Sequence, residues 1–153
     1  MDLKQAFRNA MKAEIEGREL YRVAAEKSQD PKAGDVFTFL AGEEEAHLKA
    51  LQDIYRQHLA GETIRVPRLP RPGSLEGSSP IFSEEFKTRL KDRHFEMSSL
   101  SIALKLERDS FEYYGKLSEE LGDRELSDFF SRLSEWEKGH YEAIHREIAL
   151  LEE

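Results

Sequence analysis

Six side chains that can bind a metal ion occur in two copies of one pattern along the chain. Each copy is a glutamate followed 30 residues later by Glu-x-x-His, and the second copy lies 93 residues after the first without a gap. The six residues are Glu14, Glu44, His47, Glu107, Glu137 and His140. Four carboxylates and two imidazoles are the ligands that hold two metal ions inside a four-helix bundle. The pattern therefore predicts a carboxylate-bridged centre with two metal ions.

The repeat extends well beyond these six positions. Residues 10–52 align with residues 103–145, and many identical residues coincide. The coinciding pairs include Ala10 and Ala103, Glu19 and Glu112, Tyr21 and Tyr114, Phe37 and Phe130, and Leu40 and Leu133. Each copy is expected to be a helical hairpin that cannot bury its own apolar face. Two hairpins packed face to face would share one core, and equivalent ligands would meet at a pseudo-twofold axis.

The spacing within Glu-x-x-His suits a site with two ions. Side chains three residues apart on a helix project from one face, with Cβ atoms about 5–6 Å apart. We expect Glu44 and Glu137 to bridge two ions that lie roughly 3.5–4 Å apart. Glu14 and Glu107 would then be terminal ligands, one for each ion.

A single Glu-x-x-His is a weak signal in a chain so rich in glutamate, and the sequence contains its own control. Glu142 and His145 also match the motif, but the equivalent positions in the first copy are Lys49 and Gln52. We therefore interpret this third match as a chance occurrence. His145 is expected at the surface or beside the centre, not among the ligands.

Four helices must position the six residues. Apolar residues recur at alternating three- and four-residue intervals, and no convincing strand alternation occurs. The stripes cover residues 3–24, 37–54, 100–121 and 130–151. Pro31 after Asp30, and Asp123 after Gly122, are typical of helix starts.

The six predicted ligands interrupt these apolar stripes and do not lie on polar faces. An ionised carboxylate in a bundle core costs several kcal/mol unless it is paired or bound to metal. Four carboxylates that converge would also raise one another's pKa values. Two divalent cations would cancel the four charges, so the placement favours a metal centre over a buried polar network without an ion.

One interruption divides the chain into two halves. Residues 61–82 concentrate proline, glycine and serine, which predicts a non-helical crossover between the hairpins. Ser83 is a candidate cap for a short extra helix through about Asp92. Short links within the hairpins and one long link between them are typical of ferritin-like bundles. We therefore predict an all-α chain that forms one ferritin-like, metal-binding domain over residues 1–153.

Composition narrows the class of protein. A net charge of −8 disfavours nucleic acid and anionic membrane surfaces as partners. No apolar stretch approaches about 18 residues, and the first residues lack the apolar core of a signal peptide, so a cytoplasmic location is expected. The 153 residues contain no cysteine, which excludes disulfides, thiolate catalysis and rubredoxin-type iron within them.

Tyr21 and Tyr114 each follow a predicted ligand glutamate by seven residues, two turns further along the same face. Two interpretations stay open. Each phenol could donate a hydrogen bond to a ligand carboxylate or act as a redox-active group near the metals. Alternatively, each ring could pack in the core with its hydroxyl satisfied.

The strings AMKAEIEGRELY (10–21) and ALKLERDSFEYY (103–114), each followed by a Glu-x-x-His helix, resemble the rubrerythrin branch of the ferritin-like superfamily. The resemblance covers nearly the whole chain outside the crossover. It implies a non-haem di-iron centre that reacts with hydrogen peroxide or dioxygen, with the iron ligands at the same six positions. It also implies a homodimer.

The chain departs from the rubrerythrin pattern in two ways. Typical rubrerythrins carry a rubredoxin domain whose four cysteines hold an electron-transfer iron, whereas cysteine is absent here. They also place an extra carboxylate three residues after the ligand that corresponds to Glu107, where this chain has Ser110. The site resembles a more symmetric six-ligand version. Its electrons are expected from an external donor, such as a separate rubredoxin-like protein.

The ligand set leaves three functional hypotheses open. The first is a di-iron oxidoreductase that reduces hydrogen peroxide or dioxygen. The second is an iron-binding protein with ferroxidase and storage activity. The third is a non-redox bundle that holds zinc or manganese. All three would use the same residues, because carboxylate-rich sites with two histidines accept Fe, Mn and Zn.

Overall fold

The computed structural model describes residues 2–29, 31–66 and 94–152, which form four long α-helices. In chain order the helices are α1 (Leu3–Lys27), α2 (Pro31–Leu59), α4 (His94–Glu120) and α5 (Arg124–Glu152). The described part of the chain contains no strand. The predicted all-α class is therefore confirmed.

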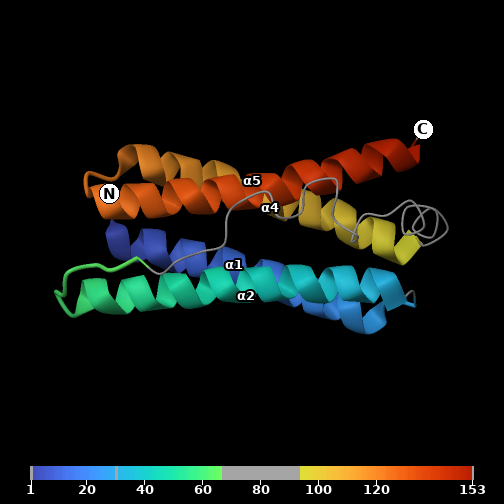
Figure 1. The fold of residues 1–153 in the computed structure, drawn as a ribbon, viewed down its shortest axis with the longest axis horizontal. Coiled ribbons are helices and arrows are strands. Elements are labelled where there is room, and N and C mark those ends of the chain that lie inside the picture. The colour runs from blue at the N-terminus through green and yellow to red at the C-terminus, as the bar shows by residue number, and fades with distance from the viewer. Residues whose placement is uncertain (1, 30, 67–93, 153) are drawn as a thin grey trace.

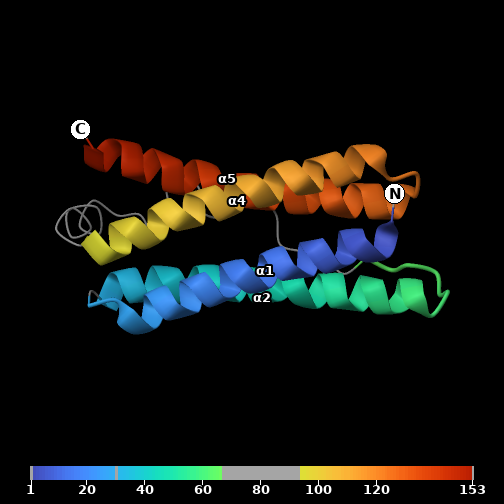
Figure 2. The ribbon, with the colours of Figure 1, turned by 180° about the vertical axis from the view of Figure 1, so that it is seen from behind.

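The four helices form two antiparallel hairpins that stack as two layers (Figures 1 and 2). Helices α1 and α2 form one hairpin, α4 and α5 form the other, and α1 packs against α4 between the layers. The N-terminus lies at the same end of the bundle as the α4–α5 turn, and the C-terminus lies at the opposite end. This is the ferritin-like four-helix bundle of two repeated hairpins that the sequence predicts.

Local chemistry sets the helix boundaries. Asp2 accepts a hydrogen bond from the backbone N–H of Gln5 at 3.3 Å, at the start of α1. Asp123 accepts one from the N–H of Leu126 at 3.1 Å, at the start of α5. Both are N-cap bonds that satisfy donors left over at a helix end. Helix α2 begins at Pro31, whose fixed φ suits the first helical position.

The segment after α2 folds back onto the helix. Gly61 has a φ of 69°, the left-handed conformation that ends many helices. The Gln57 side chain then bonds both backbone groups of Arg65: Oε1 accepts from its N–H at 2.6 Å, and Nε2 donates to its carbonyl at 3.2 Å. Ile64 and Val66 pack against the apolar core, so this non-helical segment is fixed in place.

The predicted crossover over residues 61–82 is described only as far as Val66 and is non-helical there. Residues 67–82, and the predicted short helix from Ser83 to about Asp92, lie outside the described residues. No helix that the structure describes is long and apolar enough to cross a membrane.

Two apolar clusters lie on either side of the predicted ligands along the bundle. Each helix contributes residues to both clusters. The residues that precede its predicted ligands along the chain belong to one cluster, and those that follow them belong to the other. One cluster contains, among others, Tyr21, Phe37, Leu40, Leu100 and Ile144. The other contains, among others, Phe7, Ile54, Tyr114, Phe130 and Leu133. Each large side chain that is fully buried contributes about 1.5–3 kcal/mol to folding. The six predicted ligands therefore form a polar layer between two apolar layers that exclude water.

Candidate metal centre

The six predicted ligands come together in the middle of the bundle. All four described helices contribute, because each carries ligand positions on the stripe that faces the core. The residues are Glu14 on α1, Glu44 and His47 on α2, Glu107 on α4, and Glu137 and His140 on α5. None of the six is more than 3% exposed. The repeat thus places equivalent residues at one buried point.

Their side chains form two overlapping groups, each of which could hold a metal ion. The first group is Glu14, Glu44, His47 and Glu137. The second group is Glu44, Glu107, Glu137 and His140. Within each group, one ligand atom from every residue lies within 4.8 Å of the others. Glu44 and Glu137 belong to both groups, as bridging carboxylates would. Their role as bridges, and the ligand set itself, stay predictions.

Both imidazoles turn Nδ1 toward carboxylates. His47 Nδ1 lies 2.7 Å from Glu137 Oε1 and 3.5 Å from Glu14 Oε1. His140 Nδ1 lies 3.3 Å from Glu107 Oε1 and 3.5 Å from Glu137 Oε2. His140 Nδ1 also lies 3.5 Å from Glu44 Oε1. Each imidazole is therefore beside the first glutamate of its own hairpin and also reaches a glutamate of the opposite hairpin.

Two tyrosines support the carboxylates from the opposite hairpin. The Tyr21 hydroxyl donates to Glu107 Oε1 at 2.7 Å, and the Tyr114 hydroxyl donates to Glu14 Oε1 at 2.9 Å. Both tyrosines are fully buried and also pack in the apolar clusters. The structure thus contains both the hydrogen bonds and the core packing that the sequence left as alternatives.

Gly17 is a neighbour of the centre that the sequence analysis misses. A Cβ atom at this position would lie 3.2 Å from Glu44 Oε2, closer than most such contacts in proteins. The glycine therefore leaves room for a carboxylate shared by both groups. The available signal was a small residue at equivalent positions of both repeats, since Ser110 corresponds to Gly17.

Trp136 is a second neighbour that the sequence did not place. Its buried indole meets the His47 ring nearly edge-on, at 5.5 Å between centroids and 88° between planes. It meets the His140 ring at 6.1 Å and 75°. The repeat does not predict this contact, because the residue that corresponds to Trp136 in the first copy is the half-buried Glu43. The indole therefore forms part of the buried surroundings of both imidazoles.

The control motif lies outside the centre. Glu142 is exposed, and its carboxylate lies 4.0 Å from the amine of Lys138. His145 is also exposed and stacks on Tyr141, with 5.6 Å between ring centroids. Neither side chain belongs to the groups that could hold a metal ion among the described residues.

Comparison with known proteins extends the resemblance seen in the sequence. Residues 5–148 match the family described as Rubrerythrin. The chain belongs to the rubrerythrin family. A solved structure of a hypothetical protein from Pyrococcus furiosus is similar to this rubrerythrin-family chain, with a TM-score of 0.70 and 27% sequence identity. The similarity covers 99% of this chain and 90% of that chain. A comparison with curated proteins finds no significant match.

Burial and the surrounding charges divide the four carboxylates of this rubrerythrin-family chain into two pairs, one with raised and one with lowered pKa values. Burial, followed by the charges of Glu107 and Glu14, raises the pKa of Glu137 to about 8. Burial and the neighbouring carboxylates likewise raise the pKa of Glu44 well above its usual range. Burial also acts to raise the pKa of Glu107, but the charge of His140 and several hydrogen bonds outweigh it and bring that pKa to about 2. The pKa of Glu14 is lowered in the same way.

The imidazoles respond to the same charges. Burial acts to lower the pKa of His140, but Glu107 and Glu137 outweigh it and raise that pKa to about 10. Glu14 and Glu137 likewise raise the pKa of His47 well above its usual range. In the metal-free protein, protons on the imidazoles and on the two shared glutamates offset the negative charge. Metal binding should displace these protons, as it does wherever ligands must deprotonate.

The donor atoms of this family member fit a pair of cations. Among the described residues, each of the six predicted ligands has one buried atom without a hydrogen bond. These atoms are Glu14 Oε2, Glu44 Oε1, His47 Nε2, Glu107 Oε2, Glu137 Oε2 and His140 Nε2. Buried polar atoms in native proteins almost always have a partner. Six such atoms in one place indicate a site built to bind something other than protein, and two divalent cations would match its four carboxylates.

Proposed function

We propose that this rubrerythrin-family protein is a non-haem di-iron oxidoreductase that reduces hydrogen peroxide or dioxygen with electrons from an external donor. The observation that carries the proposal is the pair of donor groups that share Glu44 and Glu137. Shared carboxylates couple two neighbouring ions, and reduction of peroxide to water needs two electrons at one place. Two ferrous ions, when bound, supply those electrons and orient the oxidant.

The residues of the chain would hold and orient this centre. Glu14 and Glu107 serve as terminal carboxylates, and the hydrogen bonds from Tyr114 and Tyr21 fix their orientation. Trp136 and the two apolar clusters keep bulk water from the imidazoles and carboxylates. A site closed in this way limits side reactions of the oxidant with solvent.

The electrons would come from another molecule, because no cysteine is present to hold a rubredoxin-type iron in these 153 residues. A separate rubredoxin-like protein is a donor of suitable chemistry. We further propose that the protein is cytoplasmic and acts as a homodimer without nucleic acid or membrane partners. A monomeric mass by sedimentation over a wide concentration range would contradict the dimer.

The decisive experiment begins with metal analysis of protein purified without oxygen. The reduced, iron-loaded protein is then mixed rapidly with hydrogen peroxide and, separately, with dioxygen. We expect two irons per chain and fast, stoichiometric oxidation by at least one oxidant. The same measurements are made on Glu137→Ala, which removes a shared carboxylate. Glu142→Ala, outside the centre, is its matched control.

Two other results would replace the proposal. Uptake of many irons per chain would favour iron storage with ferroxidase activity. Tightly held zinc, or manganese that neither oxidant changes, would favour a non-redox metal-binding bundle.

A further inference from the structure

The two tyrosines beside the centre differ in their surroundings although the repeat makes them equivalent. Tyr21 has the aliphatic Leu20 as its chain neighbour, and its ring packs on Phe37 with 6.4 Å between centroids. Tyr114 instead follows Tyr113, and the two phenol rings lie 6.2 Å apart between centroids. Tyr114 therefore has a second phenol, Tyr113, beside it, whereas Tyr21 has no such neighbour in the chain.

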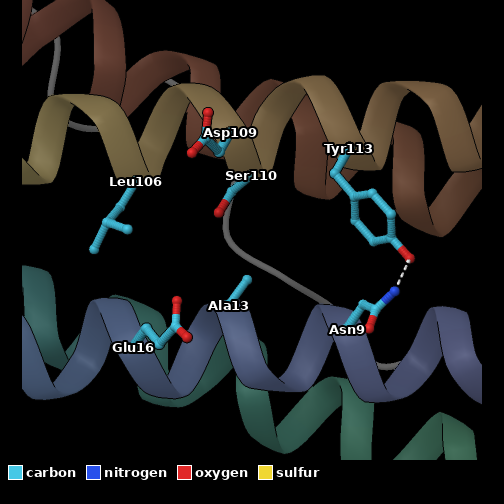
Figure 3. A pocket seen from close by; sticks show the side chains of 7 residues that line it. All are labelled: Asn9, Ala13, Glu16, Leu106, Asp109, Ser110 and Tyr113. Carbon is cyan, nitrogen blue, oxygen red and sulfur yellow. Dashed lines mark hydrogen bonds between the residues drawn. The ribbon is translucent and has the colours of Figure 1, made fainter.

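Tyr113 is half-buried and lines a surface pocket of about 310 Å³ between α1 and α4 (Figure 3). Asn9 on α1 donates a hydrogen bond from Nδ2 to the Tyr113 hydroxyl at 3.2 Å, which fixes the ring across the two helices. Ala13 and Ser110 line the pocket beside it and leave it open because both side chains are small. A small molecule in this pocket would meet the Tyr113 phenol directly.

The contacts form an unbroken line from the centre to this pocket. Glu14, a predicted ligand, accepts the 2.9 Å hydrogen bond from Tyr114. Tyr114 is fully buried and lies against the Tyr113 ring. Tyr113 then reaches the pocket. Oxidisable phenols thus span the distance between a buried carboxylate and solvent.

We propose that Tyr113 and Tyr114 form an electron-transfer path between the metal centre and the pocket, where a one-electron reductant reacts. The path rests on the proposed function, because it requires a centre that peroxide oxidises. It assigns Tyr113 and its pocket as the point of electron entry. It also gives the break in the repeat, Tyr113 in place of Leu20, a chemical role.

Each transfer along the path moves one electron from the reductant to the centre, and each phenol regains the proton that it loses. Tyr114 gives one electron to the oxidised centre and passes its phenolic proton along the existing hydrogen bond to Glu14. Tyr113 then gives one electron to Tyr114, which takes its proton back from Glu14, while the Tyr113 proton goes to solvent. The reductant gives one electron to Tyr113, which recovers a proton from solvent. Two such transfers replace the two electrons that, together with two protons taken up from solvent, reduce one peroxide to two waters.

The main competing route is Trp136. Its indole contacts both imidazoles, so an electron could enter there without any tyrosine. Tyr21 is a second alternative, because it bonds Glu107 as Tyr114 bonds Glu14. Both alternatives predict oxidised side chains at positions other than Tyr113, which makes the routes distinguishable.

The test uses iron-loaded, full-length protein mixed with peroxide without any donor. Oxidised side chains are located by peptide mass spectrometry, and radicals are followed by freeze-quench electron paramagnetic resonance. Hydroquinone, a one-electron donor small enough for the pocket, then re-reduces the protein. Tyr113→Phe keeps the ring but removes the oxidisable hydroxyl. Tyr55→Phe is the matched control, since Tyr55 stacks on Phe7 away from the centre.

We expect the oxidation products of wild type and Tyr55→Phe to concentrate on Tyr113. In Tyr113→Phe, re-reduction by hydroquinone should slow by about tenfold, the rate change that ~1.4 kcal/mol in the barrier produces, with iron content unchanged. Products confined to Trp136 or Tyr21, or equal re-reduction rates in Tyr113→Phe and wild type, would overturn the path while the proposed function stands. If peroxide fails to oxidise the iron of the wild type, the path falls, and if dioxygen fails as well, the proposed function falls with it.

Discussion

Tyr21 on α1 donates a 2.7 Å hydrogen bond to Glu107 on α4, so a side chain of one hairpin holds a predicted ligand of the other. The repeat produces the reciprocal bond, from Tyr114 on α4 to Glu14 on α1 at 2.9 Å. Neither hairpin alone can complete the surroundings of its own glutamate. The centre therefore exists only when the hairpins are packed, and metal binding should report on that packing.

Tyr21→Phe should weaken metal binding without preventing folding. The change leaves the ring in the core but removes the donor to Glu107. Loss of such a partner typically costs about 10–100-fold in metal affinity, and loss of a hydrogen bond to a charged group costs about 1.5–3 kcal/mol of stability. Competition with a chelator measures the affinity. Tyr141→Phe, half-buried on α5 against Phe111, is the control, and equal affinities in the two variants would contradict the prediction.

Glu44→Ala and Glu137→Ala should each lose far more metal than Glu142→Ala. The first two residues belong to both groups that could hold an ion, so their removal affects both positions. Glu142 is exposed and belongs to neither. Elemental analysis of protein purified in parallel gives the metal content per chain. Equal content in all three variants would show that the register of the repeat does not identify the ligands.

Gly17→Ala should separate metal affinity from the stability of the metal-free fold. The new Cβ would lie 3.2 Å from Glu44 Oε2, so the carboxylate must shift away from its shared position. The same change removes a glycine from the middle of α1, which favours the helix by about 1 kcal/mol. We expect lower metal affinity, with a metal-free melting temperature that is unchanged or higher. Titration and calorimetry on one preparation check both, and unchanged affinity would refute the steric argument.

The convergence of the six predicted ligands could be foreseen from the sequence because the repeat carries its own register. A shift of one residue would break the match between Glu14 and Glu107 and move His47 off its stripe. The start of α2 at Pro31 and the N-cap of α5 at Asp123 were also predictable, because proline geometry and capping are local effects.

The surroundings of the ligands could not be predicted, because they depend on how the two hairpins are rotated against each other. Gly17 matters only because Glu44 leans over it, and Trp136 only because its ring reaches imidazoles on two helices. The choice of Glu107 as the partner of Tyr21 likewise follows from packing between hairpins. Residue spacing along one helix contains none of this information.

The last prediction concerns stability in the absence of metal, where the shifted pKa values make the fold depend on pH. The pKa of Glu137 is about 8, above its ordinary value of 4.5, so its stabilising contribution is complete below pH 4.5 and is lost as the pH rises through 8. The pKa of His140 is about 10, above 6.5, so its contribution is complete below pH 6.5 and is lost toward pH 10. The pKa of Glu107 is about 2, so its contribution is present above pH 4.5 and is lost only in stronger acid. The metal-free protein should therefore be most stable near pH 5 and weaker at pH 8.

Metal should reverse this order, because bound cations replace the protons that acid supplies. Binding to the native state alone adds about 4.1 kcal/mol when free metal exceeds Kd a thousandfold. In a domain of this size, each kcal/mol raises the melting temperature by about 2–4 °C. Calorimetry of metal-free and metal-loaded protein at pH 5 and pH 8 should show the larger gain at pH 8, where fewer protons compete for the predicted ligands. A metal-free melting temperature that rises from pH 5 to pH 8 would contradict the electrostatics. If chelation leaves the melting temperature unchanged at pH 8, the six residues do not form a metal centre that matters to this protein.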